Sequence, residues 1–534
     1  MTEVRNPLLP CTSKLFFGAV AISVIFVLTL CLFFSPRWGS NDEVGMSMIA
    51  HGYGIAATGS PQILFSNIFW GYIVRSIPQF AGLTGYSIAT MSVPVIVGAV
   101  IIYGLIRLRV GYIACLSAFA LIIIRPVLFP QFTINAGLLM LGALICFHLY
   151  AQRNDNRTLA AGCLSALASY WVRGPEFFFV LMVATPMVPW RALLVRRTAT
   201  LALLLVAAAI AASAVIDHQS YQGSDWKLFN DLNPVRARVT DYGAASILKQ
   251  RSDVLDRHGY SKNDIDLIEN WFFVDAHIAD PQALRSMLTE IGPLHNQANS
   301  LSNVWIALKT LADTAFLPAV IAAVLLCILR RNLKTAVSWG MFLTAICVLG
   351  LLGRPGISYV YFPLICLLLV APYFSRQVSA FADRLCTGIM VIAAVVNAGL
   401  FFSASKHHQS TAEKTRADLA GFPSYPVIIW GGMFPYEDVY PVLGASAAAI
   451  SFQHYGLGSS TLAPFTVANA MEKAGLGMTR LLLQKSGVPI VANEGLYHML
   501  DIYCKEHLHA DLVELWTKQY GVVQLSQRRC DVRP

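Results

Sequence analysis

Two adjacent carboxylates, Asp42 and Glu43, are the residues of this chain best placed to do chemistry. They follow an uncharged apolar run over 15–34 and precede a polar, glycine-rich segment. A run of this length crosses about 30 Å of hydrocarbon as a helix, which puts both carboxylates at the edge of a membrane. A carboxylate there can act as a general base toward a hydroxyl group. The alternative is that both residues only cap a helix that starts near Val44, where the helix dipole favours negative charge.

Three arginines and one further acid are candidates for substrate binding. Arg125, Arg173 and Arg354 each fall at the predicted outer end of an apolar span, where a charge near hydrocarbon is costly. Arginine binds phosphate through charge-assisted hydrogen bonds, so these positions suit a phosphate-bearing substrate, with Arg125 the weakest of the three. Snorkelling to lipid headgroups is the alternative for each arginine. Glu176 is a candidate second acid or a structural partner of Arg173.

The composition is that of a multi-pass membrane protein. Of the 534 residues, 56% are hydrophobic and only 13% are charged, whereas soluble domains carry about a quarter charged residues. The net charge of +9 does not form one basic face, because Arg and Lys fall mainly in short breaks between apolar runs. The expected partners therefore include membrane lipids and exclude nucleic acid.

Apolar runs predict eleven spans, and the basic residues between them predict their orientation. The spans are 15–34, 86–106, 110–124, 132–150, 158–172, 175–189, 198–216, 312–329, 335–352, 358–374 and 385–403. Alternate breaks are rich in basic residues: Arg5, Lys14, Arg107, Arg109, Arg153, Arg157, Arg191, Arg196, Arg197, Arg330, Arg331, Lys334, Arg376 and Arg384. By the positive-inside rule these breaks are cytoplasmic. The protein is then expected in the cell inner membrane, with its N-terminus in the cytoplasm and its C-terminus in the periplasm.

This topology divides the chain into a membrane module over 1–403 and an external domain over 404–534. The module carries two external loops, 35–85 and 217–311. The first loop predicts two amphipathic helices lying in the headgroup plane. In the C-terminal part, short β-rich runs over 425–432 and 487–493 flank helical segments, which predicts a small α/β domain. The alternative is that these runs are apolar loops packed on the bundle.

Individual residues in the external segments predict further local features. Pro489 suits an edge strand or the first residues of a strand. The loop over 217–311 is hydrophilic and predicted to be helical, with a helix start at Ser261 and a buried or membrane-facing side over 270–273. Trp226 and Trp271 could stack on a sugar ring or belong to a core. No spacing of histidines and acids in this loop is typical of a metal site, so neither a metal nor a cofactor is expected.

Cysteine placement offers one candidate disulfide. Of the 11 cysteines, only Cys504 and Cys530 fall in the predicted external domain. An even pair in an oxidising compartment can form a disulfide when its geometry allows.

The first external loop also carries a family resemblance. An apolar span is followed by Ser40-Asn41-Asp42-Glu43, His51-Gly52, Thr58-Gly59-Ser60-Pro61 and Phe65-Ser66-Asn67-Ile68-Phe69-Trp70-Gly71. This layout of span, acidic residue, juxtamembrane helices and helix bundle resembles the GT-C superfamily of integral-membrane glycosyltransferases, and the motifs look like bacterial envelope-polysaccharide proteins. The resemblance covers the N-terminal two-thirds by layout and a short part of the first loop by motif.

The resemblance implies an active site, a donor and a range of acceptors. The catalytic Asp or Glu of GT-C enzymes lies in the first external loop, which makes Asp42 the first choice of base and Glu43 the second. The implied donor is a polyprenyl-phosphate-linked sugar, and the implied acceptor is an envelope glycan, a lipid or a protein. Phosphate is already a fair leaving group, so cationic side chains can stabilise it without a metal.

Two other functions are compatible with the sequence. A flippase or exporter of lipid-linked glycans would share the outer arginines without needing Asp42. The chain shows no internal repeat of the kind on which many transporters are built. A glycan polymerase or ligase would differ in using a lipid-diphosphate donor. Motifs for nucleotide binding, zinc hydrolysis and serine hydrolysis are absent from the sequence.

Overall fold

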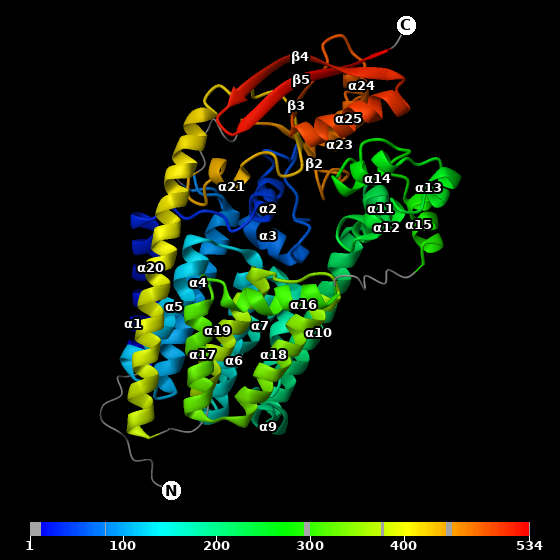
Figure 1. Cartoon of the computed structure of the whole chain (residues 1–534). Helices are drawn as coiled ribbons and strands as arrows, with labels where there is room; N and C mark the ends of the chain where they lie inside the picture. The colour runs from blue at the N-terminus through cyan, green and yellow to red at the C-terminus, as the bar shows by residue number, and fades with distance from the viewer. Residues whose placement is uncertain (1–11, 81, 293–299, 375–378, 445–450, 533–534) are drawn as a thin grey trace.

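The computed structural model describes residues 12–80, 82–292, 300–374, 379–444 and 451–532. A helix bundle forms one half of the molecule, and a five-stranded sheet with short helices lies over one end of it (Figure 1). We call this end of the bundle the sheet end. The predicted multi-span helical fold with a small C-terminal α/β domain is confirmed by this architecture. Arg5 and Arg376, used in the orientation count, lie outside the described residues.

Each of the eleven predicted spans corresponds to a helix, although the helices differ in length. Six are long and apolar enough to cross a membrane alone: α1 (Thr12–Phe33), α4 (Gly85–Arg107), α6 (Phe132–Arg153), α10 (Arg197–Ser220), α18 (Leu333–Leu351) and α20 (Ala380–Asp418). The others in the bundle are α5 (Tyr112–Leu128), α7 (Asn156–Val172), α8 (Gly174–Ala184), α9 (Trp190–Val195), α16 (Ser300–Lys309), α17 (Leu317–Arg330) and α19 (Ser358–Val370). The chain is therefore a multi-pass membrane protein.

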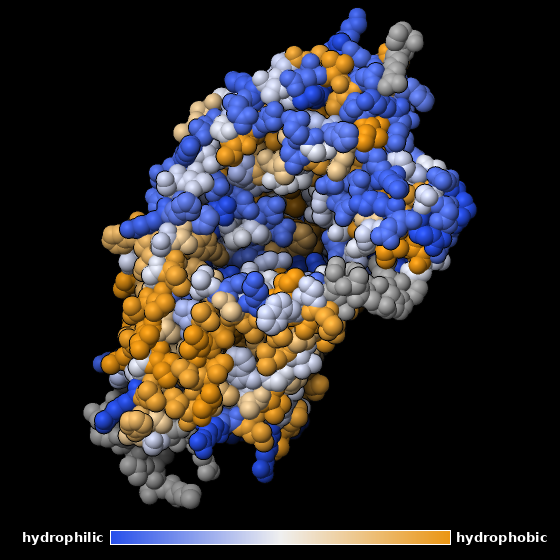
Figure 2. All heavy atoms as spheres, in the orientation of Figure 1, coloured by the Kyte–Doolittle hydropathy of each residue, from blue (hydrophilic) through white to orange (hydrophobic). Residues whose placement is uncertain are grey.

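The bundle is arranged around α6 and exposes apolar side chains outward. Helix α6 is almost wholly buried, whereas most of α10 faces outward. Figure 2 shows the result: the bundle surface is mostly apolar, and the part around the sheet is mostly hydrophilic. Helices α16 and α17 are joined by the 3-10 turn Thr310–Ala312 and lie 87° apart, so only α17 follows the predicted span. A 3-10 turn over Ala371–Phe374 extends α19.

The first loop, over 35–85, contains two helices as predicted, but α2 is packed inside the protein instead of lying on its surface. Helix α2 (Asn41–His51) buries Val44 and Met46 to Ala50 inside the protein, and α3 (Ile68–Ser76) buries part of one face. Gly52 ends α2 in the left-handed conformation, φ +73°. The following residues then join the sheet domain, because the backbone N–H of His454 donates to Gly54 O at 2.9 Å and that of Ala57 donates to Phe465 O at 2.8 Å.

The C-terminal sheet combines parallel and antiparallel pairs. Its strands are β1 (Val427–Trp430), β2 (His454–Leu457), β3 (Val488–Val491), β4 (Ala510–Tyr520) and β5 (Val523–Val532), in the order β2-β1-β3-β5-β4. Strand β1 is parallel to β2 and β3, and β5 is antiparallel to β3 and β4. The two predicted strands are thus β1 and β3. Pro489 is the second residue of β3, an interior strand, so the edge-strand option is wrong and the first-residues option holds.

Short helices complete this domain: α21 (Tyr436–Val439), α23 (Val467–Lys473), α24 (Met478–Leu482) and α25 (Glu494–His507). A disulfide joins Cys504 of α25 to Cys530 of β5, with their Cα atoms 5.9 Å apart. Helix α20 runs without a break from the bundle to the sheet domain (Figure 1). It therefore continues across the expected boundary at 403–404.

The middle external loop is helical, as predicted, and shares a hydrophobic core with the sheet domain. Its helices are a 3-10 turn Ser224–Trp226, α11 (Lys227–Thr240), α12 (Ala244–Leu248), α13 (Ser252–His258), α14 (Lys262–Glu269) and α15 (Pro281–Glu290). Phe272 is fully buried, with its ring centroid 5.4 Å from that of Trp430. Trp226 belongs instead to the larger core that includes the bundle, packed against Tyr221 and Phe465.

Candidate active site

Asp42 lies in the first turn of α2 with a partly exposed carboxyl group. Within the described part of the chain, no hydrogen bond or ion pair engages this carboxyl group, so it does not cap the helix. Burial raises the pKa of Asp42 above its ordinary value, Arg173 opposes the rise and Glu437 adds to it. A carboxylate whose pKa is moved toward neutrality and whose oxygens are unengaged is suited to accept a proton.

Glu43, its neighbour, is fully buried and fully engaged. Its Oε2 accepts hydrogen bonds from the Ser40 backbone N–H at 3.0 Å and the Ser40 hydroxyl at 2.7 Å, and its Oε1 accepts from the Phe132 backbone N–H at 3.1 Å. Burial raises the pKa of Glu43 to about 8, although these hydrogen bonds lower it. The side chain therefore caps α2, as the alternative interpretation expected, and also ties α2 to the start of α6.

The cations Arg173 and Arg354 are brought to the same region as Asp42. Arg173 ends α7 and donates through Nη1 to Phe65 O at 3.0 Å, and its guanidinium lies 5.0 Å from the Phe132 ring centroid. It interacts electrostatically with both Asp42 and Arg354. Arg354 is exposed in the break before α19, with its guanidinium 6.0 Å from the Tyr242 ring centroid. Arg173 thus lies near the Asp42 carboxylate, and Arg354 lies near Arg173.

Tyr359 completes this group and was not singled out from the sequence. It lies in the first turn of α19 and interacts electrostatically with Asp42, Arg354 and Arg173. Its signal in the sequence is its place five residues after Arg354, just past the Pro-Gly break. A phenolic hydroxyl can donate to a phosphate or to a sugar oxygen.

Glu437 brings the sheet domain to the same region, which sequence reasoning also missed. It lies on α21, beside Asp438, whose Oδ1 is 2.6 Å from Arg37 Nε at the end of the first span. Arg37 Nη2 is 3.8 Å from Glu437 Oε2. Arg416 of α20 also donates through Nε to Asp438 O at 2.9 Å. Nothing in the local sequence links Arg37 to a residue about 400 positions later.

The structure does not bring Arg125 to this group. Its guanidinium is enclosed by rings from three directions, with centroids 4.9 Å away for Phe316, 4.8 Å for Phe362 and 6.0 Å for Phe401. Arg125 is partly exposed, and among the described residues its guanidinium contacts these rings and forms no ion pair. Its aromatic contacts make Arg125 a packing residue between α5 and three other segments.

Glu176 is the third residue of α8, and its side chain is buried. Among the described residues it forms no ion pair with Arg173 within 4.0 Å, and its Oε1 has no hydrogen-bond partner. A side chain at Gly137 would lie 3.1 Å from this oxygen and 2.3 Å from Pro363, which shows how closely α6 and α19 enclose the carboxyl group. Glu176 interacts electrostatically with Arg173, but its own carboxyl group is enclosed between α6 and α19.

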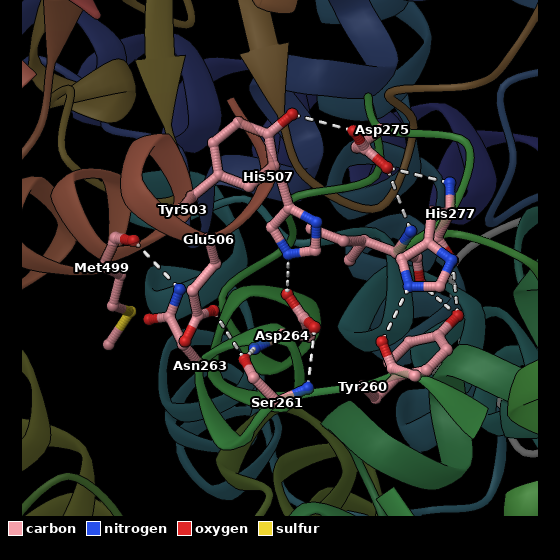
Figure 3. Close-up of polar contacts among 12 residues, drawn as sticks. Tyr260, Ser261, Asn263, Asp264, Asp275, His277, Met499, Tyr503, Glu506 and His507 are labelled. Carbon is pink, nitrogen blue, oxygen red and sulfur yellow. Dashed lines mark hydrogen bonds and ion pairs between the residues drawn. The ribbon is translucent and has the colours of Figure 1, made fainter. Parts of the chain in front are cut away.

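A second polar cluster joins the middle loop to α25, distant from Asp42 in the chain (Figure 3). His507 Nε2 lies 2.7 Å from Asp264 Oδ1, Ser261 donates through Oγ to Glu506 Oε2 at 2.8 Å, and Tyr503 donates through its hydroxyl to Asp275 Oδ2 at 2.8 Å. Ligand atoms of Asp264, Glu506 and His507 lie within 4.8 Å of one another, a grouping that chain spacing could not reveal. Because each of these groups already has a protein partner, we interpret the cluster as a docking contact.

Comparison with known proteins gives a weak structural likeness. No protein-family model and no curated protein matches the chain. Two crystal structures of ArnT from Cupriavidus metallidurans, one bound to undecaprenyl phosphate and one in the apo state, align with 96% of this chain and 98% of theirs at 11% identity, with TM-scores of 0.38 and 0.39. These values are too low to transfer an activity or a site from one protein to the other.

Proposed function

We propose that this protein is an integral-membrane glycosyltransferase that transfers a sugar from a polyprenyl-phosphate carrier to a glycan, lipid or protein acceptor of the cell envelope. The observation that carries the proposal is the unengaged Asp42 carboxyl group, held at the sheet end of the bundle near Arg173 and Tyr359, with Arg354 near those two residues. A base next to two cations matches a reaction that removes a proton from an acceptor and releases a phosphate.

The proposed step assigns one task to each group. Asp42 removes the proton of the acceptor hydroxyl as its oxygen attacks the anomeric carbon. The bond from that carbon to the phosphate oxygen breaks, and the electron pair leaves with the lipid phosphate. Arg173 and Arg354 stabilise the charge that develops on the phosphate. Glu43 acts as a positioning residue, because its three hydrogen bonds fix the first turn of α2 on which Asp42 stands.

The same proposal places the site on the external face of the membrane. Basic breaks meet at the end of the bundle away from the sheet, where Arg153 donates through Nη2 to Arg107 O and Arg196 donates through Nη1 to Tyr150 O. The positive-inside rule makes that end cytoplasmic. The membrane module over 1–403 then carries the base and the cations, and the external domain over 404–534 closes over them through α21.

The decisive test is transfer by purified protein in lipid vesicles with radiolabelled polyprenyl-phosphate sugars. We expect Asp42→Asn to lower kcat by about 10²- to 10⁴-fold, the range for loss of a general base, with unchanged thermal unfolding. Asp231→Asn, an exposed position on α11, is the matched control and should transfer normally. Full transfer by a folded Asp42→Asn protein would remove Asp42 from the mechanism. A flippase would be favoured if the wild type transfers no sugar and the Asp42→Asn variant still moves the lipid-linked sugar across the bilayer.

A further inference from the structure

A basic hollow lies at the end of the bundle opposite the sheet. The turn after α8, helix α9 and the first turn of α18 border an open hollow of about 670 Å³, with Trp190, Arg191, Val195, Arg196 and Lys334 in its lining. Helix α9 stands at this end of the bundle in Figure 1, far from α2. The hollow is therefore separate from the proposed active site.

Positive charge in the hollow has no protein counter-charge. Arg191 and Arg196 come from one segment and Lys334 from another about 140 positions later, yet all three line the same space. Among the described lining residues there is no carboxylate. Arg196 is held in place by hydrogen bonds from Nη1 to Tyr150 O at 2.8 Å and from Nη2 to Ala151 O at 3.2 Å. Three cations converging without an acid are complementary to an anion.

Helix stability does not explain this placement of Lys334. It is the second residue of α18, where the helix dipole disfavours a cation. The exposed side chains of Lys334 and Arg191 also form no ion pair with a described carboxylate. The cost of gathering these charges is offset if a negatively charged group occupies the hollow.

The surroundings of the hollow match the acyl chains of a lipid. Leu194 and Val195 are 58% and 77% exposed beside it, and Trp190 donates its indole N–H to Thr185 O while keeping much of its ring exposed. The exposed apolar face continues along α10 through Leu204 and Leu205. Cations beside exposed apolar side chains at a membrane boundary are complementary to a phospholipid, and tryptophan is enriched at that depth.

We propose that this hollow binds one anionic phospholipid, with its headgroup phosphate at Arg191, Arg196 and Lys334 and its chains along α9 and α10. The lipid belongs to the leaflet away from the sheet domain. This binding is independent of the proposed sugar transfer.

Native mass spectrometry of the full chain with added phosphatidylglycerol tests the proposal. We expect the wild type to retain one phosphatidylglycerol, and the double variant Arg191→Gln, Lys334→Gln to bind it about 25-fold more weakly, because each surface cation contributes roughly five-fold. The matched control, Arg157→Gln with Arg384→Gln, removes two exposed cations outside the hollow and should bind like the wild type. Equal thermal unfolding of all three proteins without lipid establishes that each is folded.

Three results would overturn the proposal. Equal retention of phosphatidylglycerol by the double variant would place the lipid elsewhere. Equal retention of phosphatidylcholine by the wild type would show that charge is not recognised. Displacement of the lipid by inorganic phosphate at the same concentration would assign the hollow to a soluble anion.

Discussion

Replacing Glu43 with glutamine separates its structural role from catalysis. Glutamine keeps one acceptor oxygen and replaces the other with an NH₂ group. Glu43 serves the Phe132 backbone N–H through one oxygen and both donors of Ser40 through the other. If glutamine turns its oxygen toward Ser40, the buried N–H of Phe132 loses its acceptor, which costs about 1–3 kcal/mol. We therefore expect Glu43→Gln to lower the free energy of unfolding by that amount.

Activity should respond differently from stability in this variant. Because Asp42 remains on α2 and Glu43 does not reach the substrate, kcat should stay within about an order of magnitude of the wild type, well above the loss expected for a missing base. Denaturant unfolding in detergent micelles and the vesicle transfer assay measure the two quantities on the same preparation. Glu413→Gln, an exposed position on α20, is the matched control for replacing a carboxyl group with an amide. A Glu43→Gln protein with wild-type stability and no transfer would refute this reasoning and make Glu43 the base.

Two further predictions concern the sheet domain and the loop docked on it. The hydrogen bond to Asp264 raises the pKa of His507, so the contact stabilises the folded state fully below the ordinary histidine pKa of about 6.5 and loses this contribution as pH rises through the folded-state pKa. Amide hydrogen exchange in α14 should therefore speed up across that pH window in the wild type. A His507→Gln protein that shows the same pH dependence would contradict this prediction. Replacing both Cys504 and Cys530 with serine removes a disulfide that spans 26 positions, which should lower the free energy of unfolding by about 3.5 kcal/mol through the greater entropy of the unfolded chain. Denaturation curves of the oxidised wild type and of the variant measure the difference. Coincident curves would show that the bond adds no stability.

The sequence predicts the helices well because each depends on a local property. A long apolar run forms a helix in hydrocarbon whatever its neighbours, so all eleven predicted spans coincide with helices. The strands over 427–430 and 488–491 were similarly visible as short apolar runs. The hairpin of β4 and β5 was not, because charged residues such as Glu514, Lys518 and Arg528 interrupt its apolar positions.

The site was only partly predictable because its geometry depends on distant contacts. The position of Asp42 at the end of a span is a local feature. The hydrogen bond from Phe132 to Glu43 depends on the start of α6, and the aromatic contacts of Arg125 depend on rings from three later segments. The burial of α2 likewise depends on strand residues near 454 that hold the chain after Gly52. No pattern within the first loop carries this information.

The pairing of Gly54 and Ala57 with residues 454 and 465 has a consequence for biogenesis. The first loop leaves the ribosome some 400 residues before its hydrogen-bonding partners do. Pairing over such a separation is slow, because the chain loses the entropy of closing a long loop before the contact can stabilise the fold. The first loop therefore lacks these hydrogen bonds while the helices of the bundle are inserted. A nascent chain acquires the final setting of the first loop only after α20 has been inserted and the sheet has folded.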